Sequence, residues 1–206
     1  MGGAAVEIAS GLIASRQAER QYDFDIKIAR AVDNILANSS GLQSADILNS
    51  DEFMASYERA ARLAAESASQ EQRERLAWAA AQMGDWSTVP QAIRQQLFHM
   101  LGEIQDIHAR TLAFLDDPQS FIAKTQPNWQ TEAGPFVPTT VPQLIKQWIF
   151  DNEPGSADLT DIVIDYLESH RLANVPTQMM STEGAYSTHT TRLGRDLLHL
   201  ISFPQS

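Results

Sequence analysis

Apolar residues recur at helical spacing in one segment of this chain after another. Over residues 90–115 they lie three or four positions apart, for example at Leu97, Leu101, Ile104 and Leu112. A period near 3.6 residues places such side chains on one face of a helix, and that face must be buried against another element. The segments 6–37, 50–66, 71–83, 140–149, 158–172 and 191–201 show similar spacing. The sequence therefore predicts a mainly α-helical protein.

Residues that begin or end helices separate these segments. Ser50 is a typical N-terminal cap, and Asp158 followed by Asp161 resembles a capping box. Pro118 ends the helix that precedes it. Gly102 lies inside the segment 90–115 and marks either a bend or a boundary between two helices.

The helical period is lost after residue 172. Segments 175–180 and 185–191 are rich in Val, Thr, Met and Tyr, and the turn residues 181–184 lie between them. This pattern predicts a β-hairpin, and three helices followed by a hairpin form a winged-helix unit. We expect an N-terminal helical bundle over residues 1–88. A winged-helix-like unit with one small β-hairpin would follow over residues 89–206, with an irregular, proline-rich insert at 119–139.

The helix predicted from residue 158 has two contrasting faces. Its apolar positions follow a spacing that predicts one buried stripe. They are Leu159, Ile162, Val163, Tyr166 and Leu167. Its polar positions carry carboxylates at Asp158, Asp161, Asp165 and Glu168. In a winged-helix DNA reader this third helix enters the major groove, where phosphates would repel the carboxylates. The charge placement disfavours DNA reading by this helix.

The bulk composition excludes several classes of site. The chain has 206 residues, no cysteine and a formal net charge of −11. Without cysteine there is no disulfide, zinc–cysteine site or iron–sulfur cluster. A nucleic-acid binder needs a basic surface, and no basic run is visible. The apolar stretch 4–14 is too short to span a bilayer and is interrupted by Glu7. We expect a cytoplasmic protein without a transmembrane segment.

Two clusters with acidic residues have the composition of ligand sites. His99, Glu103 and Asp106 lie at i, i+4 and i+7, a spacing that could hold a metal or support acid–base chemistry. A solvated helix face is the commoner explanation of such a pattern. Asp116 and Asp117 could bind a cation, but before a proline they more simply end a helix. We assign no metal or cofactor to either cluster.

One segment places hydroxyl groups beside an imidazole. Its residues are Ser187, Thr188, His189, Thr190 and Thr191. A nucleophile also needs an orienting third group, and neighbours on a strand point to opposite faces. A polar strand surface is the better interpretation. The four tryptophans are expected to be core or interface anchors and not a ligand cage. They are Trp78, Trp86, Trp129 and Trp148.

Two segments resemble a group of uncharacterised bacterial helical proteins. One runs from Phe98 through His108 to Asp116-Asp117-Pro118, and the other is Thr190-Thr191-Arg192-Leu193-Gly194-Arg195 followed by Phe203-Pro204. The group is also distantly similar to helical proteins named for phage abortive infection. The resemblance implies the helical architecture and a bacterial cytoplasm, but it implies no catalytic residue.

These observations favour a non-enzymatic protein. No residue is assigned a catalytic, cofactor-binding or metal-binding role. The leading hypothesis is a protein-interaction or oligomerisation module, with a protein partner or self-association. The alternative is a winged-helix DNA-binding regulator related to phage defence, although nucleic acid is the less favoured partner. A third hypothesis is a metal-dependent enzyme that uses His99 and Glu103.

Overall fold

The computed structural model describes residues 3–125 and 139–201, and over these residues the chain folds into eleven α-helices. Only two isolated β-bridges occur in the same residues, which confirms the mainly α prediction. The chain divides into two compact units. Unit 1 comprises the residues up to Glu103 together with the end of the last helix from His199. Unit 2 comprises Ile104–Leu198. The sequence placed its division earlier, at residue 88, before a helix that the structure groups with unit 1.

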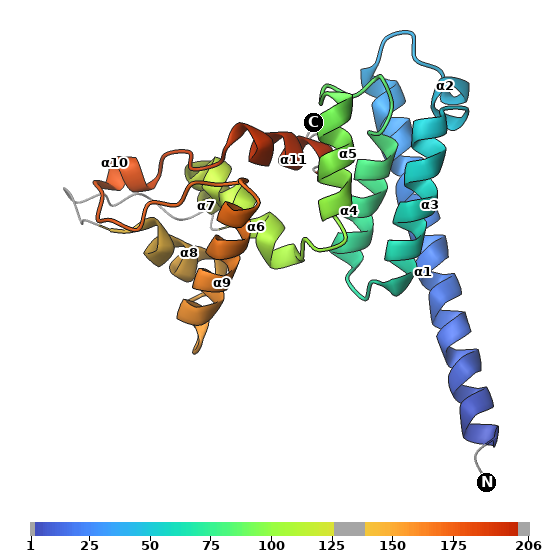
Figure 1. Cartoon of the computed structure of the whole chain (residues 1–206), viewed down its shortest axis with the longest axis horizontal. Helices are drawn as coiled ribbons and strands as arrows, with labels where there is room; N and C mark the ends of the chain where they lie inside the picture. Colours follow the sequence, from blue (N-terminus) through green and yellow to red (C-terminus); the bar gives the residue numbers. More distant parts are fainter. Residues whose placement is uncertain (1–2, 126–138, 202–206) are drawn as a thin grey trace. The chain divides into compact units, whose positions relative to one another are not determined.

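Unit 1 is a bundle built around three long helices. Its elements are α1 (Gly3–Asn38), α2 (Ser44–Leu48), α3 (Asp51–Glu66), α4 (Gln70–Ala81) and α5 (Gln91–Met100). The helices α1, α3 and α4 pack against one another, and α1 continues well past the ends of α3 and α4 (Figure 1). The core is formed where these three helices overlap.

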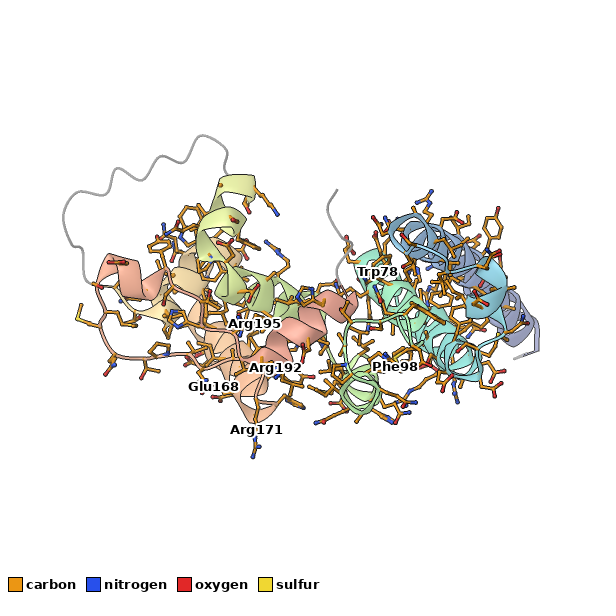
Figure 2. The ribbon with its side chains drawn as sticks, turned by 90° about the horizontal axis from the view of Figure 1, so that it is seen from above. Trp78, Phe98, Glu168, Arg171, Arg192 and Arg195 are labelled. Carbon is orange, nitrogen blue, oxygen red and sulfur yellow. The ribbon has the colours of Figure 1, made fainter. Side chains whose placement is uncertain are left out.

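The core of unit 1 combines large side chains with alanine. Trp78 of α4, labelled in Figure 2, Phe24 of α1 and Phe53 of α3 are all buried. In α4 every residue from Leu76 to Ala81 is buried, and most of them are alanines. Small side chains let helix backbones approach closely, so α4 can lie between two neighbours.

Polar groups fix the ends and the register of this bundle. The Ser50 hydroxyl accepts a 3.3 Å hydrogen bond from the Phe53 N–H, which confirms Ser50 as the cap of α3. The Asp23 carboxylate of α1 forms ion pairs with Arg73 Nε of α4 at 2.7 Å and with Lys27 Nζ at 3.3 Å. Burial opposes ionisation of Asp23, but these two cations outweigh it and lower the pKa of its carboxyl.

Unit 2 contains a core of three mutually packed helices. Its elements are α6 (Asp106–Asp116), α7 (Pro118–Thr125), α8 (Val141–Ile149), α9 (Ser156–Ser169), α10 (Thr182–Ala185) and most of α11 (Arg192–Ile201). Helices α6, α8 and α9 each contact the other two. The segment 90–115 is therefore two helices, α5 and α6, with Gly102 in the turn between them. Pro118 separates α6 from α7, as predicted.

The predicted β-hairpin of 175–180 and 185–191 is wrong. Its expected turn is the short helix α10, and the two segments do not pair with each other. Met180 instead forms a bridge with Thr139, and Thr190 forms one with Ala173. The N–H of His189 donates a 2.8 Å hydrogen bond to the carbonyl of Leu115 on α6. Each segment satisfies its backbone groups with a different part of unit 2, so no wing is present among the described residues.

Two further expectations need correction. The insert 119–139 is not irregular throughout, because α7 occupies its first part and buries Ile122. Residues 126–138, with Trp129 and Phe136, lie outside the described residues. Asp158 does not cap α9, which begins at Ser156. The cap position is held by Gly155 at φ +82°, a left-handed conformation that glycine adopts without strain.

Candidate functional site

Helix α9 exposes two large apolar side chains. Leu159 is 49% exposed and Ile162 is 60% exposed, so the prediction that both are buried is wrong. The buried positions of α9 are Ser156, Thr160, Val163, Ile164 and Leu167. Thr160 can be buried without an unsatisfied hydroxyl because this group donates a 2.6 Å hydrogen bond to the carbonyl of Ser156. The packed side of α9 is therefore rotated away from the predicted stripe.

Three aspartates lie on one side of this apolar pair. Asp158, Asp161 and Asp165 are three and four residues apart, which places them along one side of α9 beside Ile162. All three are exposed, and none forms an ion pair or side-chain hydrogen bond with another described residue. We call Asp158, Leu159, Asp161, Ile162 and Asp165 the α9 face.

The fourth predicted carboxylate of this helix has a structural role. Glu168 Oε1 accepts a 2.9 Å hydrogen bond from the backbone N–H of Val175. This bond ties the segment after α9 back to the helix. Glu168 is thus distinguished from the aspartates of the α9 face, which have no such acceptor role.

Three arginines come together where α9 ends and α11 begins. The Thr191 hydroxyl donates a 2.7 Å hydrogen bond to the carbonyl of Arg171, which holds the start of α11 beside the end of α9. Arg192 and Arg195 follow on the first turn of α11. All three arginines are exposed and lie near Glu168 in unit 2 (Figure 2). None makes an ion pair with a described residue, and we call them the arginine corner.

The backbone of Arg171 is strained. Its φ of +57° lies in the left-handed region, which costs a residue with a Cβ roughly 1 kcal/mol. The conformation closes the C-terminus of α9, since the Arg171 N–H bonds the Glu168 carbonyl at 2.8 Å. Glycine is the usual residue at such a position. An arginine there keeps a cation on the surface at some cost in stability.

Three rings stack between α6 and α9. Tyr166 lies between His108 of α6 and His170, with ring centroids 4.2 Å apart on each side. His108 is buried, and its Nδ1 accepts a 3.1 Å hydrogen bond from the N–H of Gln105. Burial, with a smaller effect of His170, lowers the pKa of His108. The stack anchors the side of α9 next to its exposed face.

The structure brings together two clusters that the sequence treated separately. Thr188 Oγ1 donates to the Asp116 carbonyl at 2.8 Å, and Thr190 Oγ1 donates to Asp116 Oδ1 at 2.7 Å. These hydroxyls fix the segment before α11 onto the end of α6. His189 is buried and forms no hydrogen bond with either hydroxyl, and burial lowers the pKa of its imidazole. The arrangement joins two segments and lacks the base–nucleophile geometry of a hydrolase.

Two open grooves are lined by polar and charged side chains. One of about 470 Å³ in unit 2 is lined by Glu168, Asn174 and His189 among others, but Glu168 is already bonded to the backbone. One of about 390 Å³ in unit 1 is lined by residues that include Arg59 and His99. There Arg59 Nη1 lies 2.6 Å from His99 Nδ1, so a cation already faces the imidazole. In each groove, part of the polar lining is therefore already bonded within the fold.

The spacing proposed for a metal site is not realised on one helix. His99 lies on α5, Glu103 in the following turn, and Asp106 at the start of α6. Over residues 3–125 and 139–201 no group of three or more His, Asp and Glu side chains is placed to hold a metal. Of the tryptophans, Trp78 and Trp148 are buried and Trp86 donates a 2.9 Å hydrogen bond to the Ala81 carbonyl. Trp129 is outside the described residues.

No protein-family model matches this chain, and no match is found among curated proteins or solved structures. The resemblance to bacterial helical proteins therefore stays a prediction. No helix in the described part of the chain combines the length and apolar character needed to cross a membrane.

The sequence did not reveal the arginine corner. More than twenty positions separate Arg171 from Arg192 and Arg195 in the sequence. One signal was available: residues 139–201 contain four lysines and arginines, and three of them lie just after α9 or in the first turn of α11. Bringing those boundaries together required the hydrogen bond between Thr191 and Arg171.

Proposed function

We propose that this chain is a non-enzymatic protein-interaction protein that binds its partner through the α9 face. One observation carries the proposal: Leu159 and Ile162 are largely exposed on a helix whose opposite side is well packed. Exposed apolar side chains framed by polar residues are typical of protein-binding surfaces. Residues that could serve catalysis, such as Thr188 and Thr190, are used to hold the fold.

A photo-crosslinking amino acid at position 162 tests this proposal. In the cells that produce the protein, the crosslinker should yield one discrete product with a second protein. The matched control is the same amino acid at Met54, an exposed apolar position on α3. Discrete products that disappear with Leu159→Ser support the proposal. Absence of any product from positions 159 and 162 would overturn it.

Self-association remains a separate prediction. Tyr22 and Ile26 are exposed on one side of α1, four residues apart, and offer a surface on unit 1 for a second copy. Size-exclusion chromatography with light scattering at micromolar concentration tests this point. A strict monomer would remove the oligomer prediction and leave binding through the α9 face untouched.

The arginine corner favours a second candidate function, nucleic-acid binding. Three unpaired arginines gather on one surface, and Arg171 keeps its place despite a strained backbone. Such side chains bind phosphates and displace counterions. The aspartates of the α9 face lie on the adjacent helix and oppose this function, so we rank it second. A connection with phage defence rests on the resemblance alone.

A salt-titrated gel shift separates the two functions. If the corner binds duplex DNA, log K should fall with log salt with a slope of about −3, as expected for three phosphate contacts. The triple variant R171A/R192A/R195A should abolish the shift, whereas R62A, an exposed arginine on α3, should not. The absence of a shift at low salt would remove nucleic acid as a partner.

A further inference from the structure

The α9 face combines two chemistries that select a particular partner. Leu159 and Ile162 are three residues apart and present adjacent apolar side chains on one side of the helix. Asp158, Asp161 and Asp165 line the neighbouring side at the same helical spacing. A helix that packs here meets an apolar ridge along one edge and a row of carboxylates along the other.

The row of carboxylates lacks compensating charge in its surroundings. No described lysine or arginine forms an ion pair with Asp158, Asp161 or Asp165. Burying such charges beneath an apolar partner would cost free energy unless the partner supplies cations. Complementary charge also steers association and suppresses incorrect partners.

Charge decides among the available occupants. A second copy of this chain would bring its own three aspartates against the first set, and like charges at an interface repel. Nucleic acids and anionic lipid surfaces are excluded from this face for the same reason. The remaining occupant is a protein segment with apolar side chains flanked by lysine or arginine.

We propose that the α9 face binds a cationic amphipathic helix of another protein. Its apolar residues would pack against Leu159 and Ile162, and its lysines or arginines would pair with Asp158, Asp161 and Asp165. An amphipathic helix presents its anchors at i, i+3, i+4 and i+7, and Leu159 and Ile162 lie at the matching i and i+3 spacing on α9. This inference rests on the proposed function, since it specifies the partner of the same surface.

The test uses the full chain and a fluorescent synthetic helix of leucine and lysine arranged at helical spacing. Fluorescence anisotropy should show saturable binding that weakens with salt. A peptide of the same composition with a permuted order, which has no apolar face, should bind at least about tenfold more weakly. If both peptides bind equally well, binding depends only on their positive charge and not on an apolar helix face, and the proposal is overturned.

Matched variants locate the binding site. The double variant L159S/I162S and the triple variant D158N/D161N/D165N should each weaken binding by about tenfold or more. The controls L48S/M54S and D46N/D51N alter exposed residues of the same types in unit 1 and should leave binding unchanged. Binding that is insensitive to the α9 variants would overturn the proposal.

Thermal unfolding separates a docking surface from an internal contact. The L159S/I162S variant should melt at the temperature of the wild-type chain. A clear decrease would show that another part of this chain covers the α9 face, and would overturn the proposal. Crosslinks at position 162 without binding of the leucine–lysine helix would reject the cationic helix and leave the proposed function standing.

Discussion

The hydroxyl of Thr190 donates a 2.7 Å hydrogen bond to the carboxylate of Asp116, although the two residues are 74 positions apart. The bond joins the segment before α11 to the last residue of α6. A neighbouring bond from Thr188 reaches the carbonyl of the same aspartate. Asp116 therefore holds together two parts of unit 2 whose pairing depends on tertiary contacts.

Thr190→Val should lower the free energy of unfolding by about 1–2 kcal/mol, because it removes a donor to a charged acceptor while keeping the shape of the side chain. Urea denaturation monitored by circular dichroism measures the change. Thr177→Val is the matched control, since Thr177 is exposed and has no hydrogen-bond partner among the described residues. Equal effects of the two substitutions would contradict the role given to Asp116.

Gly194→Ala should lower the free energy of unfolding by about 2–3 kcal/mol, as overpacking does. A Cβ at this position would overlap the carbonyl oxygen of Leu172 and would also meet the Thr190 side chain. The first turn of α11 can approach that carbonyl only if the residue is glycine. Gly102→Ala is the control, because a Cβ there meets only ordinary contacts with Leu63. A stable Gly194→Ala variant would show that α11 packs differently.

Acidification should destabilise unit 2. Burial lowers the pKa of His108 and of His189 below 6.5, so the unfolded chain takes up protons at a higher pH than the folded chain. Stability is therefore full above about pH 6.5 and falls as the pH drops below it. Urea midpoints measured from about pH 7 to pH 5 test this. His108→Gln should reduce the change of the urea midpoint with pH, whereas His199→Gln, at an exposed position, should not. If the midpoint of His108→Gln changes with pH as much as that of the wild-type chain, the buried imidazole is not the cause.

Two arginines of unit 1, Arg94 and Arg73, should respond oppositely to the same substitution. Arg94 is 2% exposed, and its Nε and Nη2 atoms have no hydrogen-bond partner among the described residues. Arg94→Met should leave the free energy of unfolding unchanged or raise it by about 1 kcal/mol, because a poorly paired buried cation is replaced by an apolar chain. Arg73→Met should lower it by about 1–2 kcal/mol, because Asp23 loses its 2.7 Å hydrogen-bond donor and keeps only Lys27. Chemical denaturation of both variants distinguishes them, and a similar loss in each would refute this view of Arg94.

Local sequence patterns determined most helix boundaries. Thr140, the first residue of the predicted segment 140–149, caps α8: its hydroxyl accepts the N–H of Gln143 at 3.3 Å, and the Gln143 side chain accepts the Thr140 N–H at 3.1 Å. Pro118 separates α6 from α7 for an equally local reason, since proline lacks the N–H that a helix interior needs. Such features depend on residues a few positions apart, and sequence reasoning reaches them directly.

The candidate site was less accessible to sequence reasoning. The aspartates of α9 were identified correctly as an acidic surface, but Leu159 and Ile162 were assigned to the core. The apolar spacing of α9 fits two overlapping stripes, and only the helices packed against it select one. The buried threonine at position 160 was the misleading residue, because its hydroxyl is satisfied within the helix.

By itself the sequence determined that this chain is helical, where most of its helices begin and end, and that α9 carries negative charge. Tertiary structure decided which side of α9 is buried, which partners Thr190 and Met180 find, and that Arg171 meets the start of α11. The physical reason is the sequence distance over which each interaction acts. Periodicity and capping act within a turn or two of helix, whereas burial and the pairing of hydroxyl and backbone groups depend on residues many tens of positions away.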